Sequence, residues 1–89
     1  MIWPIQIEMF PTSIRMRRTD PEGQVRRFFR VTVHPDLFGG AALVIESGCV
    51  GSPGTTKTRF FQDEGLAVDA LSEIEKRKVQ QGYLLLQPS

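Results

Sequence analysis

The sequence predicts an α+β fold, with a single antiparallel sheet of four to five strands and one C-terminal helix packed across one face. Three observations lead to this prediction. Apolar and polar residues alternate in several short runs before residue 62, which is the period of a half-buried strand. Sequences rich in Gly, Pro and Asp separate these runs and are typical of turns. From Asp63 to Gln81 the apolar residues instead recur every three to four positions, as in an amphipathic helix.

Ile2–Phe10 and Ser13–Thr19 both show the alternation of a strand. Ile2–Phe10 is expected to form a short edge strand or an arm. In Ser13–Thr19, Ile14 and Met16 alternate with arginines, as in a half-buried strand. Asp20–Gly23 follows as a β-turn, because proline suits its second position and glycine its fourth.

The second strand is expected over Gln24–Val33, with Phe29, Val31 and Val33 on one face and Arg30, Thr32 and His34 on the other. We expect His34–Asp36 to break this strand and Phe38–Gly40 to turn the chain back.

Two more strands flank a glycine-rich loop. Ala41–Ser47 is an apolar run and is predicted to be the third strand. Gly48, Gly51 and Gly54 follow at three-residue spacing and predict a loop that packs tightly or faces a partner. Thr55–Phe61 is predicted to be the fourth strand, with Lys57 and Arg59 on one face.

The helix should begin after Asp63, whose carboxylate can accept hydrogen bonds from the amides of the first turn. Its apolar stripe is Ala67, Ala70, Leu71 and Ile74. The next step along the stripe is Lys78, which either extends past the edge of the sheet into water or places a charge beneath a functional surface. Gly82 should end the helix in the left-handed conformation, and Tyr83–Leu86 is apolar enough for a last short strand.

Length and composition indicate one small globular domain. The chain has 89 residues, of which 40% are hydrophobic and 24% charged, and a net charge of +1. This length supports one modest core and is too short for two. Ile14–Arg30 holds six arginines against two acidic residues, a local excess of +4. Such a segment indicates a basic patch, or arginines on a solvated strand face.

The sequence predicts a cytoplasmic protein without a membrane partner. No apolar run approaches the roughly 18–20 residues that a membrane helix needs. The N-terminal segment contains Glu8 and two prolines and no basic leader, unlike a secretory signal. Cys49 is the only cysteine, which excludes an internal disulfide framework and fits a reducing compartment.

The run from about Arg27 to Tyr83 resembles a WGR domain of the short, stand-alone bacterial type. The matching motifs are RFF at Arg27–Phe29, PDLFGG at Pro35–Gly40, GxxG at Gly48 and Gly51, SPG at Ser52–Gly54, and Lys78 followed by Gly82 and Tyr83. The resemblance covers about two-thirds of the chain. It implies a single WGR-like domain over residues 13–86, preceded by an N-terminal strand or arm over residues 1–12.

The motif for which the family is named, Trp-Gly-Arg, is Ser47-Gly48-Cys49 in this chain. In poly(ADP-ribose) polymerases such domains contact DNA ends, where the tryptophan packs against the terminal nucleotide and the arginine helps to hold phosphate. Aromatic stacking is worth roughly 1–3 kcal/mol per base, and serine cannot supply it. A cysteine thiol likewise cannot replace an arginine fork on phosphate.

Two functions remain open at this point. The first is a nucleic-acid-binding module whose contacts to the backbone of DNA are weak and independent of sequence. The alternative is a degenerate WGR-like module for protein interaction or regulation that has lost DNA binding. The partner is therefore DNA or another protein, and the chain is a monomer or a homodimer. Candidate nucleic-acid-binding residues are Arg15, Arg17, Arg18, Gly48, Cys49, Gly51, Lys57 and Arg59. Residues expected to have structural roles are Phe29, Gly39, Gly40, Lys78, Gly82 and Tyr83.

We expect no enzymatic activity, no cofactor and no metal. His34 is the only histidine, and no partner residue lies at a spacing suited to catalysis or metal binding. The segment SGCVGSPGTTK lacks the GxxxxGK[ST] pattern of a phosphate-binding loop. Cys49 has no basic residue within four positions, so we expect a small loop-filling thiol rather than a reactive nucleophile.

Overall fold

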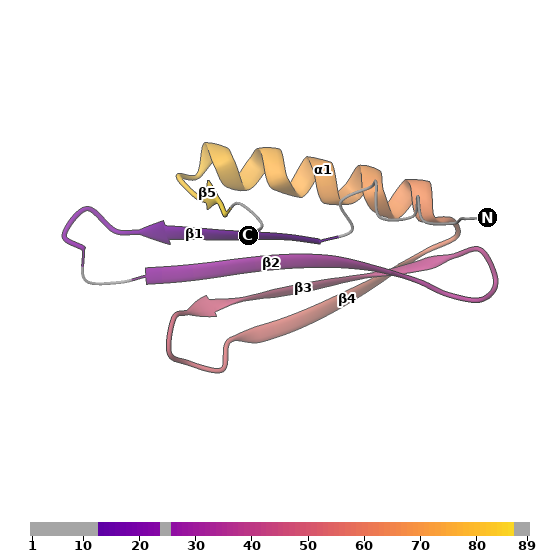
Figure 1. Ribbon diagram of the computed structural model, residues 1–89, viewed down its shortest axis with the longest axis horizontal. Coiled ribbons are helices and arrows are strands. Elements are labelled where there is room, and N and C mark those ends of the chain that lie inside the picture. Colours follow the sequence, from indigo (N-terminus) through magenta and orange to yellow (C-terminus); the bar gives the residue numbers. More distant parts are fainter. Residues whose placement is uncertain (1–12, 24–25, 87–89) are drawn as a thin grey trace, which may run out of the picture.

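The computed structural model describes residues 13–23 and 26–86, so the expected strand or arm over residues 1–12 lies outside the described residues. Its five strands form one antiparallel sheet in the order β4-β3-β2-β1-β5, and helix α1 lies across one face (Figure 1). This arrangement confirms the predicted α+β fold. The elements are β1 Ser13–Thr19, β2 Arg26–Pro35, β3 Ala41–Cys49, β4 Thr55–Phe61, α1 Glu64–Gln80 and β5 Leu84–Leu85.

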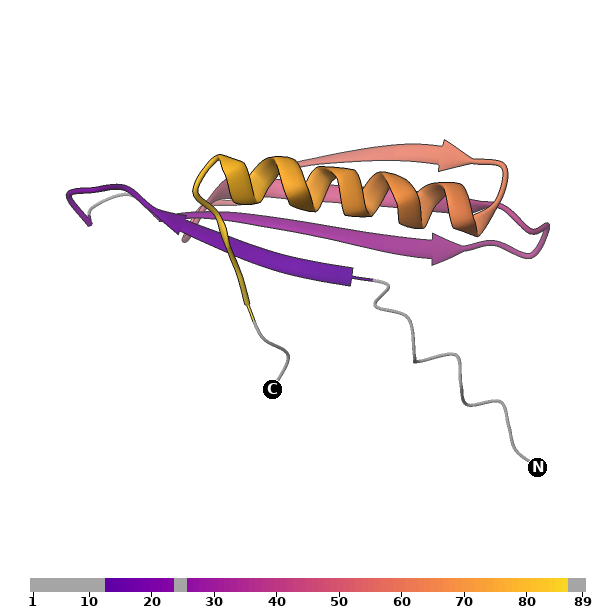
Figure 2. The same ribbon diagram turned by 90° about the horizontal axis from the view of Figure 1, so that it is seen from above.

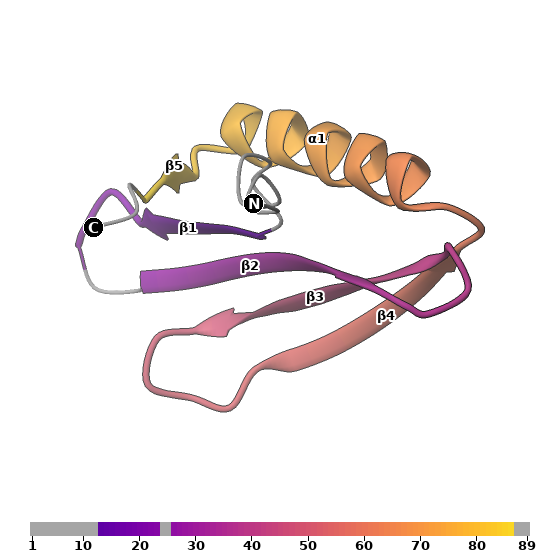
Figure 3. The same ribbon diagram turned by 45° about the vertical axis from the view of Figure 1, so that its right-hand side comes forward.

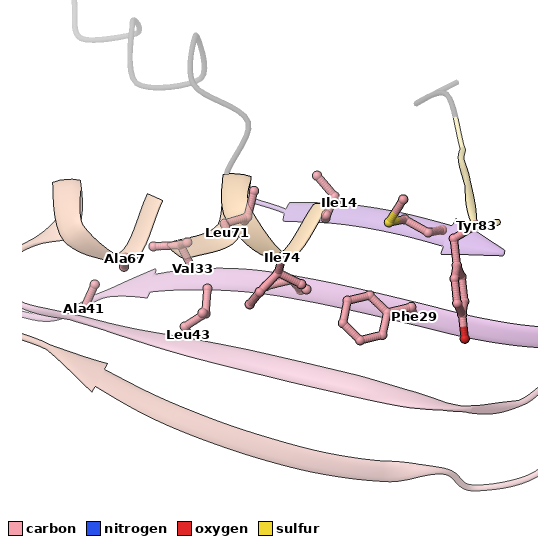
Figure 4. Close-up of a cluster of buried hydrophobic side chains, with 11 residues drawn as sticks. Ile14, Phe29, Val33, Ala41, Leu43, Ala67, Leu71, Ile74 and Tyr83 are labelled. Atoms are coloured by element: carbon pink, nitrogen blue, oxygen red, sulfur yellow. The ribbon is translucent and has the colours of Figure 1, made fainter. Parts of the chain in front are cut away.

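Helix α1 and the strands enclose a single core. From above, the helix runs along the strands (Figure 2), and its stripe of Ala67, Leu71 and Ile74 is buried. Val31 and Leu43 of the central strands are fully inaccessible beneath it, and the buried side chains of sheet and helix point toward each other (Figure 4). The other face of the sheet, which we call the open face, is not covered by any described element (Figure 3).

The ends of the helix follow the predicted pattern. The amide of Leu66 donates to Asp63 Oδ1 at 2.9 Å, which confirms Asp63 as the N-cap. Gly82 has a φ of +98°, and its amide and that of Tyr83 donate back to carbonyls of the last turn at 3.0 Å. The predicted last strand over Tyr83–Leu86 is shorter than expected and comprises Leu84–Leu85 alone. Tyr83 instead turns into the core, where its ring meets Phe29 edge-on at 6.0 Å.

The β2–β3 hairpin corrects one expectation. The segment His34–Asp36 was expected to end the second strand, but β2 continues through His34 and Pro35. Pro35 still pairs with Ala41 of β3. The turn is instead organised by Asp36, whose Oδ1 accepts hydrogen bonds from the amides of Phe38 and Gly40 at 2.7 and 2.9 Å. These bonds satisfy the turn amides locally, so the strands remain paired up to the turn.

The glycine-rich loop is also shorter than the sequence suggests. β3 ends at Cys49 rather than Ser47, because Gly48 and Cys49 pair with Phe28 and Arg27 of β2. The amide of Val50 extends this pairing with a 2.7 Å hydrogen bond to the Arg26 carbonyl. The loop proper therefore spans only residues 50–54.

Candidate nucleic-acid interface

The basic residues singled out in the sequence lie on two opposite faces of the sheet. In β1, Ile14 and Met16 are buried beneath α1, so Arg15 and Arg17 lie on the open face. In β4, Lys57 and Arg59 stand opposite Ile45 and Leu43 of the core, which places both on the face that carries α1. The eight candidate residues therefore do not form one site.

A groove lies on the helix-covered face, between β4 and the C-terminal half of α1. It has a volume of about 380 Å³, and we call it the helix-side groove. It is lined by Phe29, Ile45, Ser47, Thr55, Lys57, Arg59, Ile74, Arg77 and Lys78. The side chains of β4 remain exposed from Thr55 to Phe60. The groove thus brings the basic pair of the edge strand together with the basic last turn of the helix.

Sequence reasoning missed Arg77. It lies three positions after Ile74, at the border of the buried stripe, and in the last turn beside Lys78. This spacing could have placed it next to the sheet, because residues three apart are neighbours on a helix surface. The structure adds it to the groove as a fourth cation.

The degenerate motif is divided between the two faces. Ser47 lines the helix-side groove opposite Thr55, so the position at which the family has tryptophan borders the four cations. Cys49 lies two residues further along the same strand and is half-buried. Gly48 falls on the open face, where a Cβ would lie 2.6 Å from the Cα of Gly54. The close approach at Gly48 is therefore to the chain's own loop.

Among residues 13–23 and 26–86, no carboxylate forms an ion pair with a cation of the helix-side groove. The ion pair between Arg30 and Glu46 lies on the open face. Arg59 lies over the ring of Phe61, with Cζ 5.1 Å from the ring centroid. Lys57 and Arg77 make no hydrogen bond to another side chain in the described part of the chain. The groove therefore presents positive charge to solvent.

Lys78 connects the groove to the core. Its Nζ lies 4.5 Å from the ring centroid of Phe29 and 5.2 Å from that of Tyr83, and it donates to Gln81 Oε1 at 3.2 Å. Arg18 also lies over the Tyr83 ring, with Cζ 5.7 Å from its centroid. Burial, followed by the charges of Arg18 and Arg77, lowers the pKa of Lys78 from its usual value of 10.5. An anion in the groove would relieve this repulsion.

The described residues contain no arrangement suited to metal chemistry. No group of three His, Cys, Asp or Glu side chains among them could hold a metal ion. His34 is exposed near the end of β2, on the open face. The one helix of the described region is neither long nor apolar enough to span a membrane.

In the described part of the chain, one sheet and one helix form a small α+β domain with a cationic groove on its helix-covered face. The family model of the WGR domain matches residues 12–88, and the chain belongs to the WGR family. WGR domains are a nucleic-acid-binding type of domain and not a catalytic one. The match to the family also confirms the resemblance found in the sequence.

A curated relative is the uncharacterized protein y4dW of Sinorhizobium fredii (strain NBRC 101917 / NGR234), which is 27% identical over 73 residues. The match covers 82% of this chain and 36% of the relative, so the chain spans about a third of that protein's length. No solved structure matches the chain.

Proposed function

We propose that this chain is a nucleic-acid-binding module that contacts the phosphate backbone of DNA through the helix-side groove. The observation that carries the proposal is the convergence of Lys57 and Arg59 from β4 with Arg77 and Lys78 from α1. No carboxylate of the described residues pairs with any of these four cations. Membership of a nucleic-acid-binding family supports the same function.

The expected binding is weak and independent of sequence. Ser47 stands in the groove in place of a ring that could stack on a base, and half-buried Cys49 carries no charge. Phosphate contacts position a protein on nucleic acid but do not read its sequence. The chain is therefore expected to act as a backbone-binding module without catalytic activity of its own.

Charge is distributed unevenly along α1, in a way that would direct DNA to this groove. The first turn of the helix carries Glu64 and the last turn carries Arg77 and Lys78. Arg18 adds a further cation beside Tyr83 at the basic end. A patch of one sign raises the local concentration of oppositely charged ligands and accelerates their association.

Fluorescence anisotropy titrations at several low salt concentrations test the proposal. The ligands are labelled duplex, nicked and single-stranded DNA, and an RNA of the same length. Four phosphate contacts on a duplex predict a slope of about −3.6 for log K against log salt concentration. Lys57→Gln/Arg77→Gln should weaken binding and reduce the slope to about −1.8.

Arg15→Gln/Arg17→Gln is the matched control, because it removes the same charge from the open face. This variant should keep most of the affinity and the slope of the wild type. Absence of binding to all four ligands would refute the proposed function. Equal losses in the two double variants would refute the assignment to the helix-side groove.

A further inference from the structure

The open face carries a second groove that the proposed DNA contacts do not use. It has a volume of about 260 Å³, and its lining includes Arg15, Arg17, Phe28, Arg30, Val50 and Leu86. We call it the open-face groove. α1 covers the opposite face of the sheet (Figure 3), so a ligand in this groove would not compete with one in the helix-side groove.

Phe28 forms a fixed aromatic wall of the open-face groove. A Cβ on Gly48 would lie 3.3 Å from Phe28 Cε2, and a Cβ on Gly54 would lie 2.9 Å from Phe28 Cζ. The ring therefore packs directly against the backbone of these two glycines, which leaves it little freedom to move. Gly48 of the degenerate motif and Gly54 of the SPG segment thus hold an aromatic side chain in place on the open face.

Aliphatic side chains extend this wall. Val50 is 42% exposed and Leu86 is 36% exposed, although both are apolar. Leu84 is 73% exposed and stands opposite Arg17 in the β1–β5 ladder, which places it on the same face. Contiguous exposed apolar side chains of this kind mark surfaces that bind other molecules.

The rim of the groove is cationic. Arg30 is neutralised by Glu46, to which its Nε donates at 2.9 Å. Arg15 and Arg17 have no carboxylate partner among the described residues. The groove therefore combines an apolar wall with two uncompensated guanidinium groups.

We propose that the open-face groove binds an acidic peptide segment of a partner protein, with an apolar side chain placed against Phe28, Val50 and Leu86. Carboxylates of the segment pair with Arg15 and Arg17 in the forked geometry that suits guanidinium. Aromatic residues and arginine are enriched in protein interfaces, and lysine is depleted there. Lys57 and Lys78 line the helix-side groove, whereas no lysine lines the open-face groove. Aliphatic side chains form neither hydrogen bonds nor ion pairs with phosphate, which favours a peptide over nucleic acid as the ligand of this groove.

Fluorescein-labelled peptides of defined sequence provide the probe. The first set has two acidic residues on each side of a central Leu-Phe, Leu-Leu or Leu-Trp pair. A second set replaces the central pair with Ser-Ser, and a third replaces the acidic residues with lysine. We expect anisotropy to report binding of the first set only, and two-dimensional ¹⁵N NMR to show shifts of the Phe28 and Val50 amides.

Two double variants then separate this inference from the proposed DNA binding. Arg15→Gln/Arg17→Gln should weaken binding of the acidic-apolar peptides by about two- to thirtyfold, the usual contribution of two exposed ion pairs. Lys57→Gln/Arg77→Gln should leave peptide affinity unchanged while it weakens duplex DNA. Both variants alter exposed or groove-lining side chains outside the buried core, so folding should be retained.

Three outcomes would overturn the inference. The first is absence of binding by every acidic-apolar peptide at millimolar concentration. The second is equal binding by the Ser-Ser peptides, which would indicate charge attraction without an apolar contact. The third is that single-stranded DNA, rather than peptide, shifts the Phe28 and Val50 amides and loses this effect in Arg15→Gln/Arg17→Gln.

Discussion

Replacement of Gly48 by alanine tests whether the motif glycine serves packing. Gly48 lies within β3 and outside the positive-φ region, so its backbone would accept alanine. The space around Gly48 would not accept a methyl group, because the new Cβ would lie 2.6 Å from Gly54 Cα and 3.3 Å from Phe28 Cε2. Carbon atoms in van der Waals contact are roughly 3.5–4.0 Å apart. β3 and the loop would therefore have to separate by about 1 Å.

The size of the effect follows from overpacking. Methyl groups forced into filled space usually cost about 1–3 kcal/mol, and the lower entropy of unfolded alanine returns about 0.4–1 kcal/mol. We expect Gly48→Ala to lose about 1–2 kcal/mol in the free energy of unfolding. Urea denaturation followed by circular dichroism measures this change.

Gly51→Ala is the matched control, because a Cβ at Gly51 would meet nothing within 4 Å while φ is +94°. Its cost is that of the left-handed conformation alone, about 1 kcal/mol, and it should not disturb Phe28. We therefore expect the NMR signals of the Phe28 ring to move in Gly48→Ala and to stay in place in Gly51→Ala. A Gly48→Ala protein with wild-type stability and unchanged Phe28 signals would refute the packing argument.

Two further changes test the helix-side groove. Lys78→Met should lower the free energy of unfolding at pH 7 by less than the roughly 1 kcal/mol that contacts of the ammonium group with two rings contribute, because it also removes the desolvation and repulsion that lower the pKa of Lys78. Folding lowers the pKa of Lys78, so the unfolded chain binds more protons between the folded pKa and 10.5, and the wild type should gain stability relative to Lys78→Met as pH rises through this range. Urea denaturation of both proteins at pH 8 and pH 10 measures this change. An equal difference in the free energy of unfolding at the two pH values would contradict the argument. Ser47→Trp/Cys49→Arg should restore the motif side chains and tighten DNA binding by about five- to 150-fold through stacking alone. Anisotropy titration measures this gain, and unchanged affinity would show that Ser47 does not border the bound strand.

Much of the fold could be predicted because its signals are local. The alternation in Ser13–Thr19 and the cap at Asp63 depend on neighbours a few residues away, and both were placed correctly. The end of β3 could not be predicted in this way. Gly48 and Cys49 join the sheet because residues some twenty positions earlier in β2 pair with them, and no local pattern encodes that pairing.

The site was harder to predict than the fold for a related reason. Ile14 and Met16 indicate which side of β1 is buried, so the outward position of Arg15 and Arg17 could be read from alternation. Thr55–Phe61 contains no comparable apolar alternation, and nearly all of β4 is exposed. The face of Lys57 and Arg59 is set by the pairing of β4 with β3, which only the assembled sheet reveals.

Each pair of cations in the helix-side groove has an explanation that needs no DNA. Lys57 and Arg59 lie on an edge strand, where like charges discourage pairing with a second copy of the chain. Arg77 and Lys78 lie in the last turn of α1, where positive charge stabilises the helix dipole. Neither explanation requires the two pairs to face one groove whose described lining contains no carboxylate. Burial lowers the pKa of Lys78, and the charges of Arg18 and Arg77 lower it further. The convergence of the four groove cations, rather than their number, is therefore the argument for an anionic ligand.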